Sequence, residues 1–153
     1  ASYRRQRQMC IRDSMWKAFN ELKLLGKVSG KLPRMVAAQS TGCAPVVKAF
    51  QRRENKTEFW ENSQTVALGL NVPGPIGGYW ILRILYESNG IAVDVPESDL
   101  QNLTDEFNSI TRINAGPEAG VVWGAFQKLR NVGWIDNSQS VVLFATGIER
   151  CKL

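Results

Sequence analysis

The sequence predicts an α/β fold with a largely parallel sheet. Short segments of strand length alternate with amphipathic segments of roughly 10–15 residues, which is the pattern of β-α-β units. The segments at residues 35–39 and 141–145 are mainly apolar, as expected where both faces of a parallel sheet are covered. The chain has 153 residues, of which 44% are hydrophobic and 22% charged, so it is long enough for one domain with a substantial core.

The first helix is predicted over residues 15–26. Its apolar residues recur at steps of three and four, which places them on one face, and polar residues fall between them. Gly26 is expected to cap its C-terminal end. The apolar residues of this face are Met15, Trp16, Phe19, Leu22 and Leu25.

A strand and a second helix follow. Residues 29–33 are rich in turn-forming residues, and the apolar run at 35–39 suits a buried strand. Gly42 follows the run and ends it. The next helix is predicted at residues 44–50. Pro45 lies near its start, which fits the preference of proline for the first turn of a helix.

The same alternation continues after a polar surface loop at residues 52–62. Asn89-Gly90 is a helix stop signal, whereas Pro96-Glu97 and Pro117-Glu118 each open a helix with an acid in its first turn. The remaining predicted elements, in order, are an apolar loop at 65–72, a helix at 78–88, a strand at 91–95, a helix at 96–107, a short strand at 110–113, a helix at 117–133 and a final buried strand at 141–145.

The net charge of +5 comes mainly from one N-terminal segment. Four arginines and one aspartate within residues 4–13 contribute +3. Residues 4–14 read RRQRQMCIRDS, which resembles a transposase-type sequencing adapter translated in one reading frame. We therefore expect residues 1–14 to be an adapter-like, non-native segment and residues 15–153 to form the domain. The competing hypothesis is a genuine basic arm that binds phosphate groups.

Several kinds of site are disfavoured by composition. The chain has no histidine, which removes the commonest metal ligand and general base. Cys10, Cys43 and Cys151 have the spacing of neither a zinc site nor a disulfide framework, so we expect no metal site. No apolar run reaches the roughly 18 residues of a membrane span, and no signal peptide is evident. We expect no membrane partner and a cytoplasmic location.

Four sequence blocks are more specific than the general pattern. They are MWKAFNELKLLG followed by LPRMVAAQSTGCAPVVKAF (residues 15–26 and 32–50), ALGLNVPGPIGGYWILRILYESNG (67–90), GPEAG (116–120) and VVLFATG (141–147). In this order and spacing they resemble threonine synthases of the bacterial, archaeal and plant type, and the resemblance covers nearly all of residues 15–153.

The resemblance implies a fold and an activity. Threonine synthases are pyridoxal-phosphate enzymes of fold type II, so this chain would be a parallel-sheet, three-layer portion of that fold, truncated at the N-terminus. They convert O-phospho-L-homoserine and water to L-threonine and phosphate. In the family, the lysine that binds the cofactor covalently and the glycine-rich loop that cradles its phosphate precede the M-W-K-A-F helix, where this chain has the adapter-like segment. The resemblance therefore implies an inactive C-terminal fragment with no catalytic residue of its own, and a homodimer as the common state of complete relatives.

The resemblance also implies five residues beside pyridoxal 5'-phosphate. Thr146 would hydrogen-bond the pyridine nitrogen without forcing protonation of the ring, and Gly147 follows it. Ala67 and Gly69 match the loop that passes beside the ring. Glu118 matches a position where related enzymes place an acid. Three of the five also have a simpler role: Thr146 as a strand residue before a turn glycine, Gly69 at a bend, and Glu118 as a carboxylate favoured by the helix dipole.

Two alternatives differ from this hypothesis. A threonine or serine dehydratase has the same fold, although the L-x-V-P loop at residues 70–73 and the G-C-A-P block at 42–45 favour threonine synthase. A non-catalytic binding domain with a basic arm would bind nucleic acid in a salt-dependent way, and deletion of residues 4–14 would abolish that binding. Because most of the net basic charge lies in that segment, we expect no nucleic-acid partner for the domain.

Three tryptophans and three lysines on predicted helices are given ordinary roles. Trp16, Trp80 and Trp123 lie on apolar helix faces and are predicted to belong to the core. Lys17, Lys23 and Lys128 lie on polar faces and are predicted to be solvated rather than buried. Cys43 is expected to pack as a small apolar group.

Overall fold

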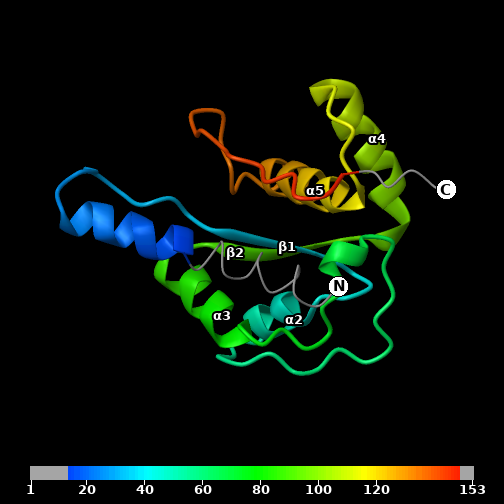
Figure 1. Cartoon of the computed structure of the whole chain (residues 1–153), viewed down its shortest axis with the longest axis horizontal. Helices are drawn as coiled ribbons and strands as arrows, with labels where there is room; N and C mark the ends of the chain where they lie inside the picture. Colours follow the sequence, from blue (N-terminus) through cyan, green and yellow to red (C-terminus); the bar gives the residue numbers. More distant parts are fainter. Residues whose placement is uncertain (1–13, 149–153) are drawn as a thin grey trace. The chain divides into compact units, whose positions relative to one another are not determined.

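The computed structural model describes residues 14–148 (Figure 1). The adapter-like residues 1–13, Cys10 and Cys151 lie outside the described residues. The observed order of elements keeps the predicted helices and the strands predicted at residues 35–39 and 91–95, but it lacks the strands predicted at 110–113 and 141–145. It comprises a helix at residues 14–24, β1 (Val36–Ser40), α2 (Pro45–Gln51), the 3-10 helix η1 (Leu68–Leu70), α3 (Gly78–Glu87), β2 (Ile91–Val95), the 3-10 helix η2 (Glu97–Asp99), α4 (Leu100–Thr111) and α5 (Pro117–Asn131).

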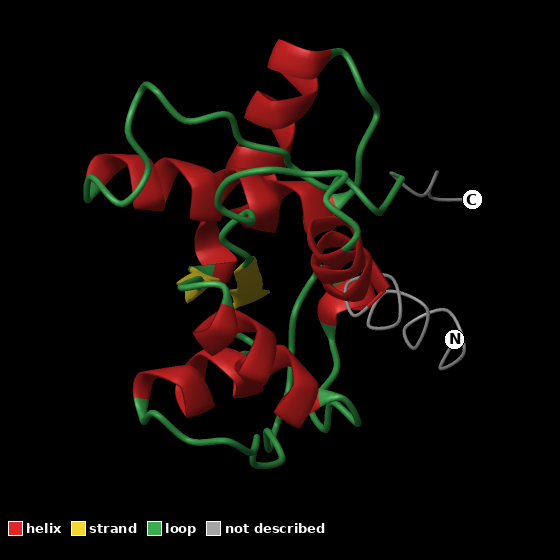
Figure 2. Cartoon of the chain, turned by 90° about the vertical axis from the view of Figure 1, so that its left-hand side faces the viewer, coloured by secondary structure: helices red, strands yellow, loops and turns green. Residues whose placement is uncertain are grey.

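The two strands form a parallel sheet, shown among the helices in Figure 2. At one end the Ile91 N–H donates to the Met35 carbonyl at 3.1 Å, and at the other the Thr41 N–H donates to the Val95 carbonyl at 2.9 Å. The two strands therefore run in the same direction, and the carboxyl ends of β1 and β2 meet at one edge of the sheet. This is the edge where α/β proteins commonly bind ligands. The predicted α/β class with a parallel sheet is confirmed.

The chain divides into two compact units. The first comprises residues 1–37, 45–59 and 74–92. In it α2 packs on α3, and the rings of Phe50 and Tyr86 stack with their centroids 5.4 Å apart. The apolar side chains buried in this unit include Val46, Val47, Ala49, Ile81, Leu82, Ile84 and Leu85.

The second unit comprises residues 38–44, 60–73 and 93–153. Helices α4 and α5 pack against each other in it. The rings of Phe107 and Trp123 meet edge to face, with centroids 6.3 Å apart. Cys43 is fully buried, as expected of a small apolar group. Other apolar side chains buried in this unit include Val95, Leu100, Ala115, Ala119, Val121, Ala125 and Leu129.

The predicted strand at residues 110–113 is wrong. Helix α4 continues through Thr111, whose hydroxyl donates to the Phe107 carbonyl at 2.8 Å. Arg112 then adopts left-handed backbone angles, with φ of 57°, and caps the helix. Local hydrogen bonds thus keep the β-branched residues helical, although their intrinsic preference is extended.

The predicted buried strand at residues 141–145 is also wrong. These residues adopt no regular structure, and Val142 and Phe144 expose 76% and 51% of their surface. An apolar segment becomes a strand only when a neighbouring backbone supplies hydrogen-bond partners, and within residues 14–148 the sheet contains β1 and β2 alone.

The helix at residues 14–24 is confirmed, but its apolar face is only partly covered. Trp16 is buried, whereas Leu22 and Leu25 are exposed. Gly26 has a φ of +65° and follows the helix as the predicted cap. Trp80 is half exposed, so its assignment to the core is wrong. None of the helices in the described part of the chain is long and apolar enough to cross a membrane.

Candidate functional site

A short loop in the second unit, residues 65–70, is held by two carboxylates. The Val66 N–H donates to Oε1 of Glu97 at 2.5 Å. Three residues further on, the Gly69 N–H donates to Oε1 of Glu118 at 2.8 Å. Hydrogen bonds to ionised acceptors are short and strong, so the two acids fix the path of this loop between them.

Glu97 belongs to a polar cluster at the carboxyl edge of the sheet. It lies two residues after the end of β2, and its Oε2 accepts a hydrogen bond from Oγ of Ser40, the last residue of β1. Its own N–H donates to Oγ1 of Thr41 at 3.0 Å, and the Gly42 N–H donates to the Ser40 hydroxyl at 3.1 Å. Ser40 is completely buried, so these bonds satisfy a polar group that would otherwise be costly inside the unit.

Glu118 lies in the first turn of α5, next to Pro117, which begins the helix. Its carboxylate occupies the space that side chains would need at three glycines. A Cβ atom would lie 2.6 Å from Oε1 at Gly69, 2.9 Å from Oε2 at Gly116 and 2.4 Å from Oε2 at Gly147. The backbone at Gly69 and at Gly147, which are distant in sequence, and at Gly116, two residues before Glu118, therefore approaches this carboxylate closely at positions that lack a side chain.

The structure brings three of the five predicted cofactor residues together: Gly69, Glu118 and Gly147. Ala67 lies in the same loop, where it is completely buried; its carbonyl accepts the Leu70 N–H at 2.8 Å. Thr146 is exposed to solvent beside Gly147.

Three further residues of this cluster escaped prediction. Gly116 donates its N–H to the Gly147 carbonyl at 3.1 Å, which ties the start of α5 to the segment after residue 140. Glu97 and Ser40 together support the start of the 65–70 loop. Glu97 carried a detectable signal, because an acid just after a parallel strand lies at the edge where such sheets place functional groups. Ser40 carried none.

The donor set of this cluster is carboxylate, hydroxyl and backbone amide. Lys128 is the lysine of the second unit within the described residues, and its ammonium binds the Asp94 carboxylate at 3.0 Å. Over residues 14–148, no three histidine, cysteine or acidic side chains are grouped so as to hold a metal ion. The cluster is thus built to position groups and accept hydrogen bonds.

The sequence of this chain is similar to those of known enzymes. The family described as "Pyridoxal-phosphate dependent enzyme" matches residues 14–147. A threonine synthase of Methanosarcina acetivorans is 28% identical over 134 residues, which are 88% of this chain and 33% of the relative. A threonine synthase of Methanocaldococcus jannaschii is 26% identical over the same shares.

The chain therefore spans about a third of the length of the curated relatives it matches. The family match, by contrast, covers nearly the whole of the described part, including both carboxylates, the 65–70 loop and Gly147. On this extent of similarity, the chain belongs to the family of pyridoxal-phosphate dependent enzymes.

Proposed function

We propose that this chain is the C-terminal portion of a threonine synthase, which converts O-phospho-L-homoserine and water to L-threonine and phosphate. The observation that carries the proposal is the carboxylate of Glu118 enclosed by Gly69, Gly116 and Gly147, in a chain whose relatives are named threonine synthases. Three of the five residues that the resemblance implied for the cofactor belong to this cluster. The proposed substrate is a small molecule, with no nucleic acid and no membrane involved.

The residues present fit the ring end of pyridoxal 5'-phosphate. An exposed hydroxyl, Thr146, stands next to a glycine that is fixed against Glu118. We propose that Thr146 holds the ring nitrogen, that Ala67 and Gly69 lie beside the ring, and that Glu118 holds their loop in place. Bound pyridoxal phosphate supplies an electron sink for the carbon atoms of the substrate.

Each of these residues has a definite task in that proposal. A neutral hydroxyl at Thr146 accepts or donates one hydrogen bond and carries no charge that would force a proton onto the ring nitrogen. Glu118 is already bound to the Gly69 N–H, so it acts as a positioning group. No described residue of this unit is assigned the covalent role, because Lys128 is paired with Asp94. We propose that the described residues alone have no catalytic activity.

A chimeric enzyme tests this function directly. Residues 14–147 would replace the matching third of the Methanosarcina acetivorans threonine synthase, and phosphate release from O-phospho-L-homoserine would be measured. We expect release above that of the host lacking the segment, and a loss of about tenfold for Thr146→Val, which removes one hydrogen bond at nearly constant shape.

The sister reaction serves as the contrasting outcome. A threonine dehydratase would release ammonia and 2-oxobutanoate from L-threonine. A chimera that binds the cofactor, as seen by its absorbance, yet performs only this second reaction would reject threonine synthase in favour of the dehydratase.

Removing the Glu118 carboxylate should loosen the 65–70 loop. Glu118→Ala leaves the Gly69 N–H without its acceptor, and we expect the free energy of unfolding to fall by about 1–3 kcal/mol. Glu118→Gln keeps an acceptor oxygen and should lose less. Urea unfolding measures the loss, and hydrogen exchange of the Gly69 amide reports it locally. Glu61→Ala, an exposed acid of the same unit, is the control; equal losses in both variants would contradict a specific role for Glu118.

A further inference from the structure

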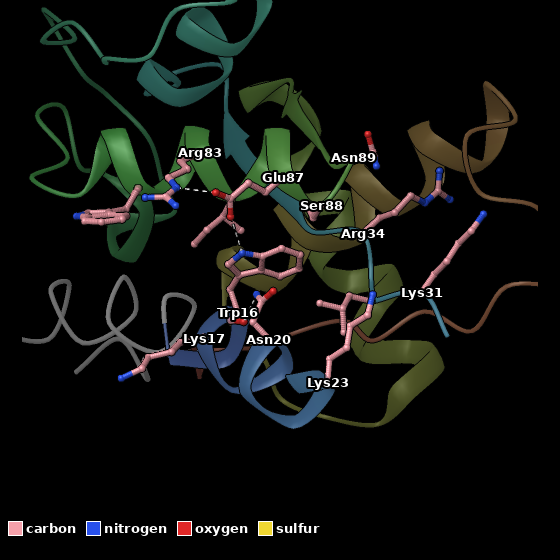
Figure 3. A pocket seen from close by; sticks show the side chains of 13 residues that line it. Trp16, Lys17, Asn20, Lys23, Lys31, Arg34, Arg83, Glu87, Ser88 and Asn89 are labelled. Atoms are coloured by element: carbon pink, nitrogen blue, oxygen red, sulfur yellow. Dashed lines mark hydrogen bonds and ion pairs between the residues drawn. The ribbon is translucent and has the colours of Figure 1, made fainter. Parts of the chain in front are cut away.

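The first unit contains a cavity of about 1140 Å³ (Figure 3). Three separate segments line it: the helix at residues 14–24, the turn-rich stretch at 31–34 and α3 with the two residues after it. All of these residues belong to one compact unit. Small-molecule sites commonly measure roughly 300–1,000 Å³, so the cavity has room for one.

The lining is strongly basic. It includes five cationic side chains and one acidic side chain, Glu87. The cations come from every segment of the wall, so the positive charge does not belong to one helix face. The five are Lys17, Lys23, Lys31, Arg34 and Arg83.

Glu87 is fully engaged with two partners. Its Oε1 accepts a hydrogen bond from Nε of Arg83 at 2.6 Å, and its Oε2 accepts one from the indole N–H of Trp16 at 3.0 Å. The hydrogen bond from Arg83 and that from Trp16 hold the pKa of this carboxyl below its ordinary value. The acid is therefore ionised at neutral pH, and its negative charge is paired with Arg83.

Among the described residues that line the cavity, the acid Glu87 lies beside Arg83 and Trp16. Figure 3 shows Lys23, Lys31 and Arg34 on the opposite side of Trp16 from Arg83. Lys17 forms an ion pair with Glu21, with Nζ 3.6 Å from the carboxylate. Positive potential is thus concentrated around Lys23 and Lys31, where a concave wall raises the local concentration of anions.

The floor of the cavity is apolar. Trp16 and Ile84 are buried, with 8% and 4% of their surface exposed, and Leu32 is half-buried beside them. A cationic rim above an apolar floor matches a ligand with several negative charges on a carbon skeleton. An extended polymer would instead need a long basic surface, which a bounded cavity does not offer.

We propose that this cavity binds a small organic molecule that carries two or more phosphate groups. The phosphates lie against Lys23, Lys31 and Arg34, and the organic body lies on Trp16 and Leu32. The site is independent of the cluster around Glu118, since no residue is shared between them.

Titration calorimetry of the full chain tests the proposal, with adenosine triphosphate and inorganic tripolyphosphate as probes at about 150 mM salt. We expect both to bind, adenosine triphosphate more tightly because only it can use the apolar floor. The double variant Lys23→Glu/Lys31→Glu should lose roughly tenfold or more in affinity for each probe, and Lys23→Gln/Lys31→Gln should lose less. Circular dichroism would check that each variant is folded.

Two controls separate the cavity from general basicity. Lys56→Glu makes the same kind of charge change in an exposed loop outside the cavity, and deletion of residues 1–13 removes the arginine-rich segment. Both variants should bind the probes as the unaltered chain does. If Lys56→Glu weakened binding as much as the cavity variants, or if the deletion abolished binding, the proposed phosphate site would be wrong. If the two probes bound with equal affinity, the proposed contact between the organic part of the ligand and the apolar floor would be wrong.

Discussion

Replacing Gly42 by alanine should lower the free energy of unfolding by about 3 kcal/mol. A Cβ atom at this position would lie 1.8 Å from the carbonyl oxygen of Gln64 and 2.9 Å from its carbonyl carbon. These are backbone atoms, so no side-chain rotation can relieve the contact. Gln64 immediately precedes the 65–70 loop, and its N–H donates to the Gly42 carbonyl at 3.1 Å. We therefore expect the substitution to displace the loop that carries Gly69.

The measurements are urea unfolding and hydrogen exchange of the Gly69 amide. Gly30→Ala is the matched control, because Gly30 has open space around it but a φ of +92°. That variant should lose only about 1–2 kcal/mol from backbone strain and leave the Gly69 amide unchanged. If Gly42→Ala cost no more than Gly30→Ala, the close approach of the two backbone segments would be wrong.

Replacing Gly120 by alanine should destabilise the second unit, although the same change inside most helices is stabilising. Gly120 lies in α5 and is buried against α4. A Cβ there would lie 2.3 Å from Oγ1 of Thr104 and 2.8 Å from the Leu100 carbonyl oxygen. Alanine is favoured over glycine by about 1 kcal/mol in a helix interior, but overpacking should exceed this gain and leave a net loss of about 2 kcal/mol.

A double-mutant cycle with Thr104→Ala checks the cause. Removing the Thr104 hydroxyl takes away the closest atom, so the pair should be less destabilised than the sum of the single changes. The Leu100 carbonyl remains, and the rescue should be partial. Asn131→Ala, on the exposed end of α5, should change stability by less than about 0.5 kcal/mol. A rise in the unfolding midpoint for Gly120→Ala would contradict the close packing of α4 on α5.

The regular elements of this chain were largely readable from local pattern. The helix at residues 14–24, α2, α3 and α5 follow from apolar residues at helical spacing and from Pro45 and Pro117 at helix starts. The strand β2 begins and ends at the predicted residues. These features depend on neighbours in sequence, which is why sequence alone could place them.

The two strands that were predicted wrongly show what the local sequence pattern cannot predict. Residues 110–113 are β-branched in part, yet the side-chain bond from Thr111 to Phe107 keeps that turn helical. Residues 141–145 are apolar, yet no neighbouring strand is paired with them among the described residues. A helix carries its own hydrogen bonds, whereas a strand depends on a partner that its own sequence does not specify.

The candidate site was only partly foreseeable for a similar reason. Glu118, Gly69 and Gly147 were identified through resemblance to a family, and nothing in their separate positions along the chain indicated that they touch. Gly116 and Glu97 were missed because their partners, the Gly147 carbonyl and the Val66 N–H, lie in segments distant in sequence. The Glu118 carboxylate meets Gly69 and Gly147 only after folding has brought these two segments to the start of α5.

By itself, the sequence determined the α/β class, the order of the helices, the places of β1 and β2, and the family to which the chain belongs. Periodicity, capping residues and motif order are all local in the chain. Only the tertiary structure decided that Glu118 and Glu97 hold one loop between them, and that basic residues of three segments surround one cavity. Those arrangements depend on hydrogen bonds and excluded volume between residues far apart in sequence, and no pattern along the chain records such distances.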